Sequence, residues 1–316
     1  MLSRVADAIY WMGRYIERAE NVARFIDVNL HLMLDLPVDP KGQWDPLITA
    51  TGDHEMFQKR YGDATAENVI RFLTFDADYP NSIIASLRAA RENARQVREI
   101  ISSEMWEQIN RFYLMVTDAS RNNQAFNRSH QFFEDVKLNS HLVTGLMEAT
   151  MSHGEPWHFA RMGCLLERAD KTSRILDVKY FILLPKVEYV NSPYDNIQWA
   201  AVLKSVSGLE MYRKQYHRIN PKSVCEFLIF DRQFPRAIRY CLTSTETSLY
   251  AITGNLAGTV SNAAERRLGR LRADLDYADI EEVFQKGMHE YLDRLQTKLN
   301  EVGNALSAIF FGSPEN

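Results

Sequence analysis

Apolar residues recur every three or four positions along most of the chain, the spacing typical of amphipathic helices packed on a core. The first such stretch runs from Ser3 to about Leu36 without a proline, and Pro37, Pro40 and Pro46 then interrupt it. The same spacing predicts further helices over residues 44–51, 67–73, 131–151, 155–184, 235–253 and 281–309. No stretch combines strand alternation with hairpin turns, so the sequence predicts an all-α fold.

Two helix starts are marked by polar residues. Asn81 or Ser82 can cap a helix whose buried side includes Ile84 and Leu87. Ser103 opens another helix, with acidic residues in its first turn, where the helix dipole favours negative charge.

Two pairs of segments in the chain resemble each other. Residues 13–29 and 163–179 are identical at seven of 17 positions, and both contain a Glu-Arg-Ala-acid sequence. Residues 43–80 and 198–235 are identical at twelve of 38 positions. Because the two pairs are collinear, they predict an internal duplication of about 155 residues.

The duplication predicts the domain organisation. We expect a single helical-bundle domain over residues 1–312, made of a first half, 1–150, and a second half, 151–312. A short C-terminal tail, 313–316, follows. Two related halves would pack most simply about a pseudo-twofold axis, which places equivalent helices near each other.

The repeated Glu-Arg helix carries a polar stripe on an otherwise apolar surface. In the first copy the stripe consists of Arg14, Glu17, Arg18, Asn21 and Arg24, and in the second of Glu167, Arg168, Lys171, Arg174 and Asp177. Glu–Arg pairs on an exposed helix contribute only about 0.2–0.5 kcal/mol, whereas removing one partner of a buried pair costs about 3–5 kcal/mol. The stripe therefore indicates either an ion-pair network between the halves or a charged binding pocket, and both remain open.

A third polar surface occurs only in the first half. Its residues follow helical spacing and continue into the next helix: Arg88, Arg91, Glu92, Arg95, Glu104 and Glu107. The simpler interpretation is a solvated helix face with ion pairs along it. The alternative is a site for phosphate or carboxylate groups, which guanidinium binds in bidentate geometry. In that case we expect Arg14 and Glu104 to approach Arg88 and Arg95 from neighbouring helices.

Composition narrows the class of protein. With 316 residues and 46% hydrophobic positions the chain can bury a large core. A net charge of −4 argues against a nucleic-acid binder. The N-terminal region lacks the apolar segment of a signal peptide, and no apolar run is long enough to span a bilayer. Cys164, Cys225 and Cys241 are widely spaced, which is typical of reduced core thiols and predicts a cytoplasmic protein.

Motifs for cofactors and catalysis are weak or missing. Residues 153–158 (HGEPWH) offer two imidazoles and a carboxylate, but Pro156 is more typical of a helix start than of a metal site. The sequence contains no HExxH, Walker loop, GxGxxG or GxSxG motif. We therefore expect no metal and no cofactor in this chain, and the sequence identifies no catalytic residue.

Several long segments together resemble a known family. They are MLSRVADAIYWMGRYIERAENVAR, LRAARENARQVREIISSEMWE, LLERADKTSRILDVK and FLIFDRQFPRAIRYCL. In this order they are similar to the bacterial alpha-E family, which is helical and named for a Glu-Arg motif. The resemblance covers residues 1 to about 311, and it implies that Glu17-Arg18 and Glu167-Arg168 are the motif residues.

The resemblance also implies a setting. Alpha-E members accompany, or are fused to, circularly permuted ATP-grasp proteins, often beside transglutaminase-like peptidases. ATP-grasp enzymes join carboxylates to amines through acyl-phosphates. The expected function is thus a helical partner of such a ligase in small-peptide synthesis or modification, with ATP and magnesium bound by the partner only. The alternative is an enzyme in its own right, acting on a peptide or amide intermediate in an Arg/Glu-lined pocket.

Overall fold

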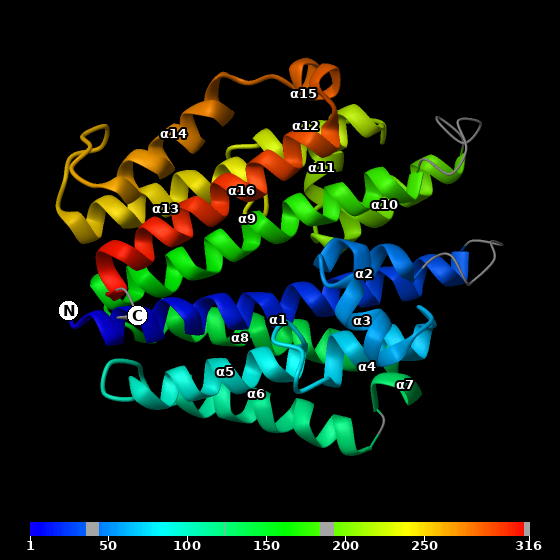
Figure 1. Ribbon diagram of the computed structural model, residues 1–316, viewed down its shortest axis with the longest axis horizontal. Coiled ribbons are helices and arrows are strands. Elements are labelled where there is room, and N and C mark those ends of the chain that lie inside the picture. Colours follow the sequence, from blue (N-terminus) through cyan, green and yellow to red (C-terminus); the bar gives the residue numbers. More distant parts are fainter. Residues whose placement is uncertain (36–43, 123, 184–192, 313–316) are drawn as a thin grey trace.

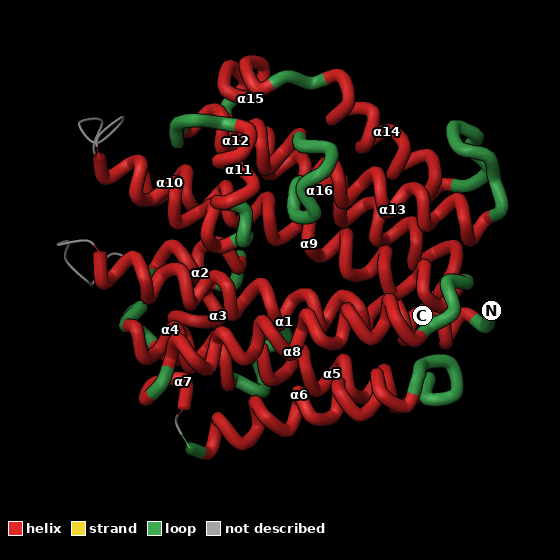
Figure 2. Tube along the Cα trace, turned by 180° about the vertical axis from the view of Figure 1, so that it is seen from behind, coloured by secondary structure: helices red, strands yellow, loops and turns green. Residues whose placement is uncertain are grey.

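The structure is a computed structural model that describes residues 1–35, 44–122, 124–183 and 193–312. Within these ranges every regular element is a helix, as Figure 2 shows. The predicted all-α fold is therefore confirmed.

Two long helices run side by side through the middle of the molecule (Figure 1). They are α1 (Ser3–Asp35) and α9 (Glu155–Leu183), which carry the two copies of the Glu-Arg motif. The prediction that these two helices lie against each other is confirmed.

Each central helix packs against two long helices of its own half, and short helices of the opposite half contact it as well. Helix α1 packs against α5 (Ile83–Gln96) and α8 (Ser129–Thr150), and α6 (Ser103–Arg121) lies over both. On the other side, α9 packs against α13 (Ile238–Thr253) and α16 (Met288–Leu306), which α14 (Ala263–Tyr277) contacts in turn. Three of the short elements are α7 (Gln124–Asn127), α15 (Ile280–Lys286) and a π-helix, Ser307–Phe311.

The order of the short helices repeats along the chain. Helices α2 (Asp45–Thr51), α3 (His54–Tyr61) and α4 (Ala66–Phe75) precede α5, while α10 (Pro193–Ser205), α11 (Leu209–Gln215) and α12 (Pro221–Phe230) precede α13. The first residues of α3, α4 and α5 and those of α11, α12 and α13 differ by 155 positions in each case. A duplication would produce this order, although the superposition of complete halves stays a prediction.

Local capping explains where several helices begin. The Ser82 hydroxyl accepts a hydrogen bond from the Ala85 amide at 3.2 Å, so Ser82 is the N-cap of α5. Helix α6 begins at Ser103 as predicted, with Ser102 as its cap. Thr65 and Asn220, which occupy matching positions in the repeat, cap α4 and α12.

The single helix predicted over residues 281–309 is wrong. The chain is interrupted at Gly287, whose φ of +91° is incompatible with a continuing right-handed helix. Apolar spacing persists on both sides of this glycine, and the sequence pattern therefore does not reveal the break.

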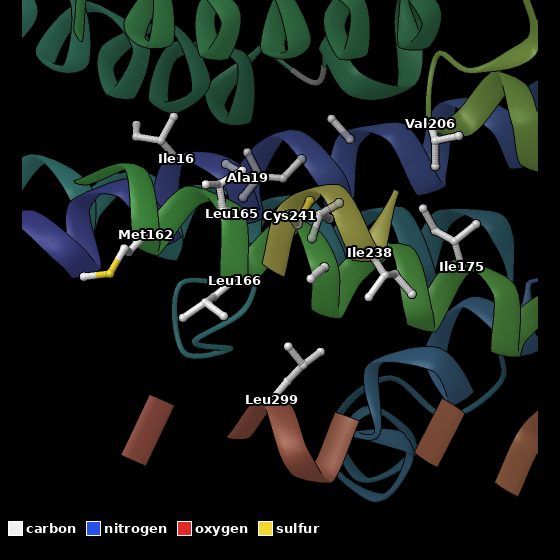
Figure 3. Packing of buried hydrophobic residues seen from close by; sticks show 14 of the residues in the cluster. Ile16, Ala19, Met162, Leu165, Leu166, Ile175, Val206, Ile238, Cys241 and Leu299 are labelled. Carbon is white, nitrogen blue, oxygen red and sulfur yellow. The ribbon is translucent and has the colours of Figure 1, made fainter. Parts of the chain in front are cut away.

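The buried core is continuous across the two halves. Figure 3 shows Ala19 of α1, Leu165 of α9 and Cys241 of α13 packed together at its centre. All three cysteines are buried and unpaired by disulfides, as expected of core thiols. None of the described helices is long and apolar enough to cross a membrane.

Candidate functional site

The backbones of α1 and α9 approach each other closely at two glycines. A Cβ atom at Gly13 would lie 2.4 Å from the carbonyl oxygen of Ala160, and one at Gly163 would lie 2.1 Å from that of Tyr10. Both distances are far below van der Waals contact, so any side chain at either position would push the helices apart. The glycines thereby bring the charged residues one turn later within reach of the opposite helix.

The two Glu-Arg motifs bind each other reciprocally. Arg18 donates from Nε to Glu167 Oε1 at 2.7 Å and from Nη2 to Oε2 at 3.0 Å. In the same way Arg168 donates from Nε to Glu17 Oε1 at 3.0 Å and from Nη2 to Oε2 at 2.7 Å. Both carboxylates are buried, with Glu17 1% and Glu167 0% exposed. Each pair has the two-pronged geometry in which arginine binds carboxylate most strongly.

Glu167 receives further cations from both central helices. Arg14 Nε donates to Glu167 Oε2 at 2.9 Å, and the Arg14 guanidinium also lies over the Trp11 ring. The Lys171 ammonium, one turn along α9, is 3.5 Å from Glu167 Oε1. Both oxygens of this buried carboxylate are therefore paired with positive charge.

Glu17 obtains its extra donors from a different place. The position equivalent to Arg14 in the second copy is Cys164, which carries no charge. Instead Arg236, just before α13, donates from Nη1 to Glu17 Oε1 at 3.0 Å, and Asn21 donates to the same oxygen at 2.9 Å. The halves thus neutralise equivalent glutamates by different means.

A second tier of acids extends the network. Glu20 accepts from Arg24 Nε at 2.8 Å, from Ser140 at 2.7 Å and also from Arg236. Its counterpart Asp170 accepts from Arg174 Nε at 3.0 Å and from Lys171 at 3.0 Å. Together these side chains form what we call the central network: Arg14, Glu17, Arg18, Glu20, Asn21, Arg24, Glu167, Arg168, Asp170, Lys171, Arg174 and Arg236.

The acids of the central network are ionised in the folded protein. Burial opposes the charge of Glu17, but Arg168 and Arg236 hold its pKa below the usual value. Burial likewise opposes ionisation of Glu20 and Glu167, yet the neighbouring cations lower the pKa of each well below its usual value. The pKa of Asp170 is lowered in the same way by Lys171 and Arg174 against the effect of burial. The interface between the halves is therefore held by full charges.

The geometry resembles a structural lock more than an open pocket. The guanidinium groups of Arg14, Arg18 and Arg168 point at carboxylates from the opposite helix, and their side chains are only 12–17% exposed. The thiols of Cys164 and Cys241 are not activated as nucleophiles, because burial raises the pKa of each to about 12. We conclude that the polar stripe of the sequence forms the interface between the halves.

The arginine-rich face of α5 does not assemble as expected. Arg88 is exposed and donates to the Ala77 carbonyl at 2.9 Å, while Arg95 Nε donates to Glu92 at 2.9 Å. Arg88 and Arg95 are seven positions apart, which corresponds to about 10 Å along the helix axis, and their guanidinium groups bond to different partners. Arg91 donates to Asn110 of α6 at 2.7 Å.

The expected approach of Arg14 and Glu104 to this face is wrong. Arg14 is held in the central network by Glu167, on a different helix pair. Glu104 and Glu107 are exposed in the first turns of α6. The α5 face is thus a solvated charged surface, and Arg91 links α5 to α6 by its hydrogen bond to Asn110.

Sequence reasoning missed three members of the central network, whereas Lys171 was already part of the stripe predicted in the second copy. Glu20 and Asp170 could have been found, because both are the acid of the repeated Glu-Arg-Ala-acid sequence. Arg236 gives no local signal at all, since only the packing of the segment before α13 brings it to Glu17.

Comparisons with known proteins agree with the sequence and the fold. A family model described as a predicted alpha-helical domain with a conserved ER motif matches residues 1–311. Uncharacterized proteins of Mycobacterium bovis and Mycobacterium tuberculosis are 24% identical to this chain over 336 aligned positions. These alignments cover 98% of this chain but only 37% of each relative, which is therefore much longer. No solved structure matches.

The family model spans nearly the whole chain and is described by a conserved ER motif, and this chain brings two Glu-Arg pairs together between α1 and α9. The chain belongs to the alpha-E family.

Proposed function

We propose that this protein is a helical binding partner of a circularly permuted ATP-grasp ligase that makes or modifies small peptides. The observation that carries the proposal is the closure of the central network, in which both oxygens of Glu17 and of Glu167 bond to cations within the chain. Residues engaged in this way hold the scaffold together. The outer surfaces are then available to bind another protein.

Two further points support this proposal. The mycobacterial relatives contain the equivalent of this chain beside a larger amount of other sequence, so the domain occurs joined to additional protein. The resemblance to alpha-E members also implies ATP-grasp proteins as companions. An accessory role explains why a domain without a catalytic motif would be kept next to a ligase.

Co-purification tests the proposal directly. The protein is co-expressed with a circularly permuted ATP-grasp protein from the same organism, only one of the two carries an affinity tag, and ATP hydrolysis is measured for each alone and for the mixture. We expect a stable complex and ATP turnover that differs between the complex and the isolated ligase. Failure to co-purify in either tagging direction, with unchanged turnover, would overturn the proposal.

Charge reversal on the α5 face tests whether this face is the contact surface. Arg88→Glu combined with Arg95→Glu changes two exposed side chains, and Arg266→Glu combined with Arg270→Glu makes the matched change on α14. Surface substitutions of this kind usually change the free energy of unfolding by less than about 0.5 kcal/mol. We expect only the α5 variant to weaken co-purification. Equal weakening by both variants would place the contact elsewhere.

One observation favours the alternative of an enzyme in its own right. Seven basic side chains of the central network bond to only four acidic ones, and four of the arginines keep an exposed edge. Such a surplus could attract a carboxylate or acyl-phosphate. Phosphate titration of the isolated protein separates the two functions, because only a pocket would bind phosphate tightly and lose it in an Arg14→Ala variant.

A further inference from the structure

A cluster of two histidines and one carboxylate lies outside the central network. Asp27 and His31 are one turn apart on α1, and His130 is in the first turn of α8. One ligand atom from each of the three residues lies within 4.8 Å of the other two. Figure 1 shows how α8 lies alongside α1, which brings residues 100 positions apart together.

The distances suit a single metal ion. Asp27 Oδ1 is 3.1 Å from His130 Nδ1 and 3.6 Å from His31 Nδ1, and the two imidazole rings are 4.2 Å apart between centroids. Metal–nitrogen and metal–oxygen bonds of about 2.0–2.2 Å place neighbouring ligand atoms about 3–3.5 Å apart. His31 Nδ1 also lies 2.9 Å from the Asp27 carbonyl oxygen, so His31 must give up this contact, or bind through Nε2, for all three residues to contact one ion.

Burial differs among the three side chains in the way a binding site requires. The Asp27 side chain is 6% exposed, whereas those of His31 and His130 are 54% and 42% exposed. The carboxylate is thus held in place by the buried side of the cluster, and the imidazoles can turn toward an ion that enters from solvent. The solvent side leaves room for water as a further ligand.

Lys137 fixes the carboxylate without covering the cluster. Its ammonium lies 2.7 Å from Asp27 Oδ2 and also pairs with Glu134, so it uses the oxygen that faces away from the histidines. A partner on the second oxygen is a common way to orient a metal-binding carboxylate. Because Lys137 offsets part of the negative charge, the site does not suit calcium or magnesium, which need several oxygen ligands.

We propose that Asp27, His31 and His130 bind a divalent transition-metal ion of the zinc type, with water completing the coordination. Imidazole nitrogens are preferred ligands for zinc, copper, nickel and iron, and a carboxylate oxygen completes a common three-residue set. The site is independent of the proposed ATP-grasp partnership, since it shares no residue with the central network or the α5 face.

The second half offers an internal control. Asp177, the counterpart of Asp27 in the repeat, is 2.7 Å from His289 Nδ1. Among the described residues, Asp27, His31 and His130 bring three ligand atoms within 4.8 Å of one another, whereas Asp177 and His289 do not belong to such a group of three. Loss of His289 therefore removes a comparable histidine–aspartate contact without affecting the proposed site.

Calorimetric titration with zinc chloride tests the proposal on protein first treated with a chelator. We expect one zinc ion per chain, and at least tenfold weaker binding in His130→Ala and in His31→Ala. His289→Ala should bind as the unchanged protein does. Asp27→Asn should also bind weakly, but it leaves Lys137 without its partner and can unfold the protein. The His31 and His130 side chains are largely exposed, so their replacement should not disturb folding. Melting temperatures equal to that of the unchanged protein in the presence of chelator will show that both variants fold.

Two results would overturn the proposal. One is the absence of zinc binding to the unchanged protein, which would mean that Asp27 serves only to pair with Lys137 and the two histidines. The other is zinc binding that His130→Ala and His289→Ala weaken equally, which would indicate scattered surface histidines. Cobalt gives an independent reading, since its visible absorption band should appear on binding and disappear in His130→Ala.

Discussion

Glu17 and Glu167 show how one residue type can hold two helices at a fixed distance. Each is completely buried, and each meets a two-pronged arginine from the opposite helix. A buried ion pair is not necessarily more stable than an apolar pair, because both charges lose their hydration. Once it is present, however, neither partner can be removed alone without leaving the other charge buried.

Alanine substitution tests this at residue scale. We expect Glu17→Ala and Glu167→Ala each to lower the free energy of unfolding by about 3–5 kcal/mol, because Arg168 or Arg18 would then be buried without its carboxylate. Urea denaturation measures the change. The matched control is Glu67→Ala, which breaks an exposed pair with Arg71 and should cost less than about 1 kcal/mol. Similar losses in all three variants would show that the central pairs are no stronger than surface ones.

At the scale of elements, close helix approach depends on backbone atoms as well as charges. The Cα of Gly163 faces the carbonyl oxygen of Tyr10, and the Cα of Gly13 faces that of Ala160. The carbonyl groups belong to helical backbone, which cannot move aside as a flexible side chain could. The short distance between α1 and α9 is thus a property of the glycines, and the bidentate pairs depend on it.

Gly163→Ala should destabilise the protein, although alanine favours helices. The added methyl group would overlap the Tyr10 carbonyl, and overpacking of this kind costs about 1–3 kcal/mol. Gly145→Ala is the control, because that glycine is in the middle of α8 with no atom near its Cβ position. There the substitution should stabilise by about 0.5–1 kcal/mol. Thermal and urea unfolding of both variants would contradict this account if the two changes had the same sign.

Most of the helices, but only part of the network, could be predicted from the sequence. Apolar spacing located α1, α8 and α9 to within a few residues, since their buried faces are continuous. It failed at Gly287, where a backbone angle, not a change of pattern, ends the helix. The repeated Glu-Arg motif identified Glu17 and Arg168 but not Arg236, because that contact exists only once α13 has packed against α9. His130 could not be linked to Asp27 for the same reason.

At the scale of the whole molecule, the charges of the central network make stability depend on pH. The pKa values of Glu17, Glu20, Glu167 and Asp170 are lower in the folded protein than in the unfolded chain. Their contribution is therefore complete above the unfolded value, about 4, and is lost as the pH falls through the folded values. We expect the free energy of unfolding to decrease as the pH is lowered below about 4. A Glu17→Gln, Glu167→Gln variant should show a smaller slope, and parallel curves would contradict the assignment.

The same charges should prevent either half from folding alone. Glu17 is bound by Arg168 and Arg236, which both come from residues 151–312. Glu167 is bound by Arg14 and Arg18, which come from residues 1–150. A separated half would keep buried acids without their partners and would expose the apolar surface between α1 and α9.

We therefore predict that fragments 1–150 and 151–312 are unfolded or aggregated when made separately and form a one-to-one complex when co-expressed. Circular dichroism and gel filtration distinguish these states, and the intact chain should unfold in a single transition. The cut falls beside Met151, between α8 and α9, so it interrupts neither helix.

Charge complementarity can be tested in the same system. A first fragment with Glu17→Ala should assemble more weakly than one with Glu67→Ala, because only the former loses a contact between the halves. If each fragment alone were monomeric and unfolded cooperatively, each half would fold independently, and the central network would not be required for folding.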